Sequence, residues 1–138
     1  MTGEYQHVLD NKGRLFMPAR LRDDLGEVFY LCKGLDGCLF VYSSENWGKM
    51  EEKIAGLPIS QARQFQRTIY PSAQKCEPDS QGRVLINQKL RDYAGLDKNV
   101  TVIGAGGHAE IWASAAWESQ DAQLTAQTLE DAMNLLNL

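Results

Sequence analysis

The chain has 138 residues, of which 43% are apolar and 23% charged, and its net charge is −4. This length and composition suit one compact domain, which we expect to span residues 1–138. No apolar run approaches the roughly 18 residues of a membrane span, and residues 1–5 lack the basic start and apolar stretch of a secretory signal. The sequence therefore excludes a membrane protein and predicts a cytosolic one.

The charge is unevenly distributed. Residues 99–138 contain five acids and no Lys or Arg, whereas residues 1–98 contain fourteen basic and thirteen acidic residues, a net of +1. Between Tyr5 and Arg22 there are four basic residues against a single acid, Asp10. A local charge of +3 can bind phosphate while an acidic tail keeps the chain soluble. The negative net charge therefore does not exclude a nucleic-acid partner.

A short pattern occurs twice, as Asp-Asn-Lys-Gly-Arg at 10–14 and as Asp-Ser-Gln-Gly-Arg at 79–83. Over residues 10–26, seven of seventeen positions are identical to those 69 residues later. A period near 70 is too long for a solenoid. We therefore expect two copies of one supersecondary unit, at residues 4–47 and 73–117, whose apolar faces are buried against each other.

Each copy begins with a short strand and a tight turn. The strands are expected at residues 4–9 and at about 73–77. In the turns, Asp10 and Asp79 can accept hydrogen bonds from the backbone NH groups that follow them. Gly13 and Gly82 can adopt positive φ without a Cβ penalty. These four residues are therefore predicted to shape the two loops.

An apolar strand, a two-turn helix and a β-hairpin follow each turn. The strands are expected at Leu15–Met17 and Val84–Ile86, and the hairpins at 28–42 and 100–112 around glycine turns. Pro18 suits the first helical position and Asn87 an N-cap. Gly26 and Gly95 are expected to end the helices as left-handed caps. The unit is thus β, turn, β, short α, then a β-hairpin, and the fold class is α+β.

Helices are also expected in a connection at 48–70 and in a C-terminal segment at 118–138. Three serines are placed to start them: Ser43 or Ser44 before a helix at Trp47–Ala55, Ser60 after Pro58, and Ser114 before the C-terminal segment. An apolar stripe in that last segment predicts packing on the core or on a neighbouring subunit. The stripe consists of Leu129, Met133 and Leu136.

No metal, cofactor or catalytic site is expected. The three cysteines, Cys32, Cys38 and Cys76, include no Cys-x-x-Cys pair and are expected to be reduced, half-buried thiols. His7 and His108 lie too far from them in sequence to indicate a metal site. The Gly-Ala-Gly-Gly segment at 104–107 lacks the Lys-Ser or Lys-Thr of a phosphate loop, and no nucleophile elbow is present.

The paired Asp-x-x-Gly-Arg turns, the apolar triplet after each, and Leu-Arg-Asp before a glycine closely resemble the MraZ family. That family is a member of the AbrB-like, swapped-hairpin transcription regulators, and the resemblance covers all but the last twenty or so residues. It implies a swapped-hairpin, double-psi-like β-barrel with peripheral helices. It also implies a cytoplasmic, nucleoid-associated homo-oligomeric ring that binds double-stranded DNA at promoter direct repeats and represses its own division and cell-wall operon. A head-to-tail ring suits direct repeats better than palindromes.

The resemblance places the family's Asp-x-x-x-Arg motif on Asp10 with Arg14 and on Asp79 with Arg83. Arg14 is the first candidate for DNA contact, because its planar guanidinium matches guanine or phosphate. Lys12 offers a mobile cation for phosphate. Asn11 can reach an adenine edge or cap the turn.

The second loop is less basic, with Ser80 and Gln81 in place of an Asn-Lys pair. Gln81 and Arg83 are therefore secondary candidates, and the structural alternative is that Arg83 pairs with Asp79 or with an acid of the other copy. Arg20 and Arg22 follow on the short helix and can flank a DNA groove. Because Arg22 matches Arg91 of the second copy, a shared structural ion pair is the alternative there.

Two other classes of function are alternatives to a DNA-binding regulator. An antitoxin-like interaction module would bind its partner through the acidic C-terminal segment. A small enzyme on a double-psi-like barrel would need a pocket of convergent titratable groups, which the sequence does not show. We therefore expect a DNA-binding regulator.

Overall fold

The computed structural model describes residues 1–138 and has the element order that the repeat predicts. The first copy contains β1 (Glu4–Val8), β2 (Arg14–Phe16), α1 (Ala19–Leu25), β3 (Phe29–Lys33) and β4 (Leu39–Ser43). The second contains β5 (Gln74–Cys76), β6 (Arg83–Leu85), α5 (Gln88–Ala94), β7 (Asn99–Gly104) and β8 (Ala109–Ala113). The remaining helices are α2 (Ser44–Ala55), α3 (Ile59–Arg67), α4 (Ile69–Ser72), α6 (Ser114–Ala122) and α7 (Ala126–Leu135). The predicted α+β class is confirmed.

The first strand of each copy pairs with the hairpin of the other copy. β1 pairs with β7 and β5 pairs with β3, in a six-stranded antiparallel sheet of order β1-β7-β8-β4-β3-β5. β4 and β8 join the two halves at the centre, with Leu39 opposite Ile111. β2 and β6 form a separate two-stranded antiparallel ribbon. β1 and β5 are the edges of the six-stranded sheet, so a closed swapped-hairpin barrel remains a prediction.

The core lies between the inner face of the sheet, the β2–β6 ribbon and the short helices α1 and α5. Alternate strand residues point inward, as the period of a strand requires. They include Phe29, Leu31, Leu39, Val41, Val100, Val102, Ala109 and Ile111, all fully buried. Leu21 and Leu25 of α1, with Leu90 and Ala94 of α5, add one i, i+4 apolar pair from each helix. Both copies thus contribute to a single core.

The two short helices differ at their ends. The Asn87 side chain accepts a hydrogen bond from the Leu90 NH at 2.9 Å, and Gly95 is left-handed with φ 61° and ψ 32°, as predicted. The prediction for Gly26 is wrong in part, because its φ is 78° but its ψ is −168°. In the first copy, only the Gly26 NH donates a hydrogen bond to a carbonyl of the preceding helix. In the second copy, the NH groups of both Gly95 and Leu96 do so. Pro18 has ψ 131° and precedes the helix instead of opening it.

The peripheral helices begin earlier than predicted. The Ser43 side chain accepts a bond from the Asn46 NH at 3.1 Å, so α2 starts at Ser44 and not at Trp47. The helix after Pro58 starts directly, one residue before Ser60. Ser114 does not cap α6, since it is the first helical residue and its hydroxyl lies 2.9 Å from the Thr101 hydroxyl.

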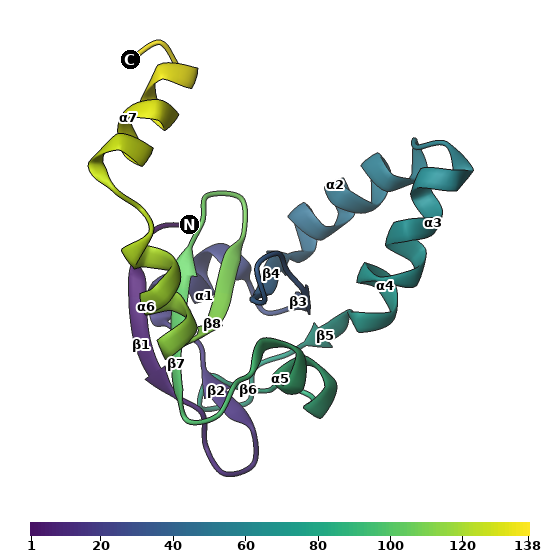
Figure 1. The fold of residues 1–138 in the computed structure, drawn as a ribbon. Helices are drawn as coiled ribbons and strands as arrows, with labels where there is room; N and C mark the ends of the chain where they lie inside the picture. The colour runs from purple at the N-terminus through teal and green to yellow at the C-terminus, as the bar shows by residue number, and fades with distance from the viewer.

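Two extensions leave the body of the molecule in different directions. Figure 1 shows α2 and α3 as an arm on one side and α7 projecting from the other. Trp47 anchors the base of the arm by stacking on Tyr30, with ring centroids 4.9 Å apart. No residue of α7 is buried. None of the helices combines the length and apolar character that a membrane crossing requires.

The cysteines are internal. Cys32, Cys38 and Cys76 are all free and buried. Burial raises the pKa of each thiol to about 12, so all three are protonated at neutral pH. Protonated buried thiols are inert, and their role is to fill the core.

Candidate nucleic-acid interface

The first turn is built around the Asp10 carboxylate. One oxygen, Oδ1, accepts hydrogen bonds from the NH groups of Lys12 at 2.9 Å and Arg14 at 2.8 Å. The other, Oδ2, accepts from Arg14 Nε at 2.7 Å. The turn closes with a 3.0 Å bond from the Gly13 NH to the Asp10 carbonyl, and Gly13 has φ 82°. Asp10 therefore fixes both the backbone and the arginine side chain.

The second turn repeats this geometry. Asp79 Oδ1 accepts from the NH groups of Gln81 and Arg83, each at 2.9 Å, and Oδ2 accepts from Arg83 Nε at 2.9 Å. Gly82 has φ 79° and its NH bonds to the Asp79 carbonyl at 2.9 Å. Arg83 thus forms the ion pair with Asp79 that the sequence offered as an alternative, and Arg14 forms the same pair with Asp10.

The hydrogen bonds in the turns keep both aspartates ionised. The backbone NH of Arg14 is the main reason that the pKa of Asp10 lies below its ordinary value, and the NH of Arg83 has the same effect on the pKa of Asp79. Each arginine uses Nε to bind its aspartate, while its terminal Nη atoms have no partner within the chain. Each guanidinium is therefore oriented but still able to donate to a ligand.

The β2–β6 ribbon places both arginines on one surface. The middle residue of each strand is buried, so the flanking residues face outward. Arg14 lies opposite Leu85, and Phe16 lies opposite Arg83. The outer face of the ribbon thus alternates two arginines with two exposed apolar side chains, 39% exposed for Phe16 and 55% for Leu85. A two-stranded ribbon is one of the elements that the major groove of B-DNA admits.

Each short helix sends an arginine beneath the turn of the other copy. A Cβ on Gly13 would lie 2.6 Å from Arg91 Cζ, and a Cβ on Gly82 would collide with Arg22 Nη1. The Arg22 guanidinium also lies 4.9 Å from the centroid of the Phe16 ring. The positive φ of both turn residues therefore favours glycine, and a side chain at either position would also displace the end of a flexible arginine.

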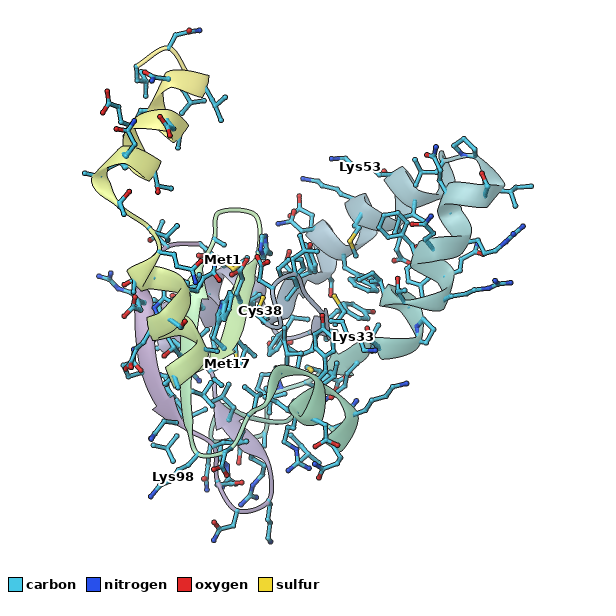
Figure 2. All side chains as sticks on the ribbon, in the orientation of Figure 1. Met1, Met17, Lys33, Cys38, Lys53 and Lys98 are labelled. Atoms are coloured by element: carbon cyan, nitrogen blue, oxygen red, sulfur yellow. The ribbon has the colours of Figure 1, made fainter.

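The grooves beside the two turns differ in charge. The groove beside the first turn is lined by two cations, Arg91 and Lys98, and two acids, Asp10 and Asp97. Figure 2 shows Lys98 at the same end of the molecule as this turn, which is the purple loop between β1 and β2 in Figure 1.

The groove beside the second turn has one cation, Arg22, against Asp23, Glu27 and Glu77. It therefore carries a net −2, whereas the groove beside the first turn is neutral. Together with the exposed Lys12, this makes the first turn the more favourable of the two for an anionic ligand.

The structure brings some of the predicted site residues together and not others. Asn11 and Lys12 are exposed at the tip of the first turn beside Arg14, and Gln81 is exposed at the tip of the second. Arg22 lies beside the second turn. Arg20 is exposed on α1 and makes no hydrogen bond or ion pair, so nothing fixes it relative to either turn.

Two cations near the first turn were not among the predicted site residues. Arg91 could have been found, because it matches Arg22 in the repeat. No local sequence pattern marks Lys98 as a site residue. Lys98 lies near the first turn because the NH of Leu9, directly after β1, donates a 2.8 Å hydrogen bond to its carbonyl.

A family model described as "MraZ protein, putative antitoxin-like" matches residues 1–68 and 69–136. The chain belongs to the MraZ family. Each match contains one Asp-x-x-Gly-Arg turn, so the resemblance that rested on these turns is confirmed and the MraZ unit is the internal repeat.

Relatives in the MraZ family match over nearly the whole chain. A protein of Heliobacterium modesticaldum named "Transcriptional regulator MraZ" is 50% identical over 137 residues, covering 98% of this chain and 96% of the relative. One of Desulforamulus reducens with the same name is 44% identical over 138 residues, covering 99% and 97%. One of Carboxydothermus hydrogenoformans, also so named, is 50% identical over 119 residues, covering 85% and 83%.

Proposed function

We propose that this chain is a sequence-specific DNA-binding transcriptional regulator that recognises tandem direct repeats in a promoter through its Asp-x-x-x-Arg turns. The observation that carries the proposal is the first turn, where Asp10 orients Arg14 while Lys12 and Asn11 remain exposed. The relatives named as transcriptional regulators, and not as enzymes, support this class of function.

The turn geometry supports a division of roles among its side chains. Because Arg14 is already held through Nε, it loses less conformational entropy on binding and can present its Nη atoms to guanine O6 and N7 or to phosphate. Lys12 has no partner in the chain and suits a phosphate. Arg83 has the same orientation, but its groove is more acidic, so it contributes less.

A single turn with few cations binds DNA weakly, so the proposal includes assembly. A homo-oligomeric ring would present identical turns in series, and the second and later contacts would form at a high effective concentration. By occupying the direct repeats upstream of its own division and cell-wall operon, such a ring would repress transcription at the nucleoid. The exchange of β1 and β5 between the copies supports the swapped-hairpin barrel as its architecture.

A DNA shift assay with the upstream region at fixed salt tests the proposal. We expect Arg14→Ala to weaken specific binding by about 1 to 3 kcal/mol, as loss of a bidentate base contact would. Arg83→Ala should cost less. Lys53→Ala is a matched control, because Lys53 is a cation at the other end of the molecule from Lys98 and the first turn (Figure 2). Unchanged affinity of the Arg14 variant would remove Arg14 from the site.

The number of repeats in the probe tests the assembly. DNA with one repeat should bind the wild-type chain much more weakly than DNA with three or four, by about 100-fold or more if avidity operates. Equal affinities for the two probes would contradict the ring. Absence of binding to any upstream probe would contradict the regulator and favour an interaction module.

A further inference from the structure

The helix α7 carries an apolar seam with nothing packed on it. The seam consists of three helical residues, Ala126, Leu129 and Met133, and of Leu136, which directly follows the helix. Their spacing is the 3-4-3 of a coiled-coil seam. Leu129 is 60% exposed, Met133 42% and Leu136 68%. A helix of this length is marginal in water on its own, and stable ones are held by packing of the apolar face. The seam therefore indicates a partner.

The charges around the seam restrict what the partner can be. The helices α6 and α7 contain four acids, Glu118, Asp121, Glu130 and Asp131, and no basic residue. At about 100° per residue, Glu130 flanks the seam, whereas Asp131 lies on the opposite side of the helix. Two copies of α7 packed together would place like charges side by side, which disfavours self-pairing. The seam requires a surface that is apolar and basic.

The helix α3 offers such a surface. Ile59, Arg63 and Arg67 follow one another at i, i+4 and i+8, so they share one face. Ile59 is 79% exposed, and neither arginine makes a hydrogen bond or an ion pair. The helix contains no acid, and the acids of the arm, Glu45, Glu51 and Glu52, are all on α2. α3 is thus the basic part of the arm.

These two helices project from opposite sides of the same chain (Figure 1). We propose that α7 of one copy packs along α3 of a second copy, with the seam on Ile59 and Glu130 facing Arg63 and Arg67. The two surfaces are different, so the contact is head-to-tail and can close a ring. The inference rests on the self-association in the proposed function, and it does not depend on DNA binding.

The apolar part of the contact is tested by sedimentation of the purified full-length chain. Leu129→Gln with Met133→Gln should raise the concentration of half-dissociation at least tenfold, since two side chains lose burial. Leu135→Gln is the matched control, because Leu135 is 85% exposed but lies away from the seam. Circular dichroism shows whether each variant keeps its helices.

The charged part of the contact between α7 and α3 is tested by reversing the charges of its side chains. Glu130→Arg should raise the half-dissociation concentration about twofold to fivefold, as expected for an exposed ion pair. Asp131→Arg makes the same change in net charge on the far face and should have no effect. Arg63→Glu with Arg67→Glu should also weaken assembly, and adding Glu130→Arg to that variant should restore part of it.

The outcomes separate this contact from the proposed ring. A wild-type chain that stays monomeric overturns both. A wild-type chain that assembles, with the Leu129 and Met133 variant assembling equally well, overturns the contact and leaves the ring standing. Loss of assembly in that variant but not in the Leu135 variant, together with rescue by sign exchange, supports the contact.

Discussion

The turn at residues 10–14 and the turn at 79–83 are held by the same set of hydrogen bonds but present different chemistry to solvent. In each, an aspartate binds two backbone NH groups and the Nε of an arginine four residues later. The first has a lysine at its tip and a neutral groove, whereas the second has a glutamine and an acidic groove. Duplication has thus kept the interactions that build the fold, while the exposed positions differ.

The largest expected effects on stability come from replacing the glycine that both turns share. Gly13→Ala and Gly82→Ala should each lower the free energy of unfolding by about 1 to 2 kcal/mol, mainly because alanine is strained at positive φ. Urea denaturation measures both. Gly48→Ala, in α2 with open space around it, is the control and should be neutral or slightly stabilising. A large loss of unfolding free energy at only one of the turns would show that the two turns do not stabilise the fold equally.

The difference in charge between the two turns is tested by exchanging the residues at their tips. Lys12→Gln gives the first turn the tip of the second and should lower the salt slope of log K for DNA by about one, with little change in sequence preference. Gln81→Lys makes the opposite exchange and should leave the slope unchanged, since the second groove disfavours phosphate. Titrations at several salt concentrations decide this. Equal and opposite shifts would mean that both turns face DNA.

The smallest expected effect concerns the charge of the two aspartates. Their pKa values lie below the ordinary 3.8, so the ionised carboxylates stabilise the fold above that pH, and the contribution is lost as the pH falls through the folded-state pKa. Asp10→Asn and Asp79→Asn should therefore be less stable than wild type at pH 7, with the difference shrinking in acid. Denaturation at a series of pH values measures it. A difference that stays constant with pH would rule out the carboxylate charge as its cause.

Local features of the fold could be predicted from the sequence because their causes are local. The two turns follow from Asp and Gly at fixed spacing, and the cap of α5 follows from Asn87. The helix ends were harder to predict, because Gly26 and Gly95 occupy equivalent positions in the repeat but adopt different ψ angles. The chain that leaves each helix decides the angle, and the glycine itself does not.

Contacts between distant segments could not be predicted, and they complete the candidate site. Nothing near Lys98 indicates that it lines a groove with Asp10, because the two segments meet where the chain just after β1 bonds to the chain just before β7. Arg91 beneath Gly13 has only an indirect signal, which is its match to Arg22 in the repeat. Sequence reasoning identified the two turns and Arg22, and it left out Arg91 and Lys98.

The exchange of first strands sets a condition on how this chain folds during synthesis. Glu4 of β1 pairs with Ile103 of β7, about 100 positions later. At about 5 to 20 residues per second, β1 waits for roughly 5 to 20 s before its partner leaves the ribosome. During that time its hydrogen-bonding edge is open to other chains. The first copy therefore depends on the completion of the second, and a stalled or truncated product would expose an unpaired strand.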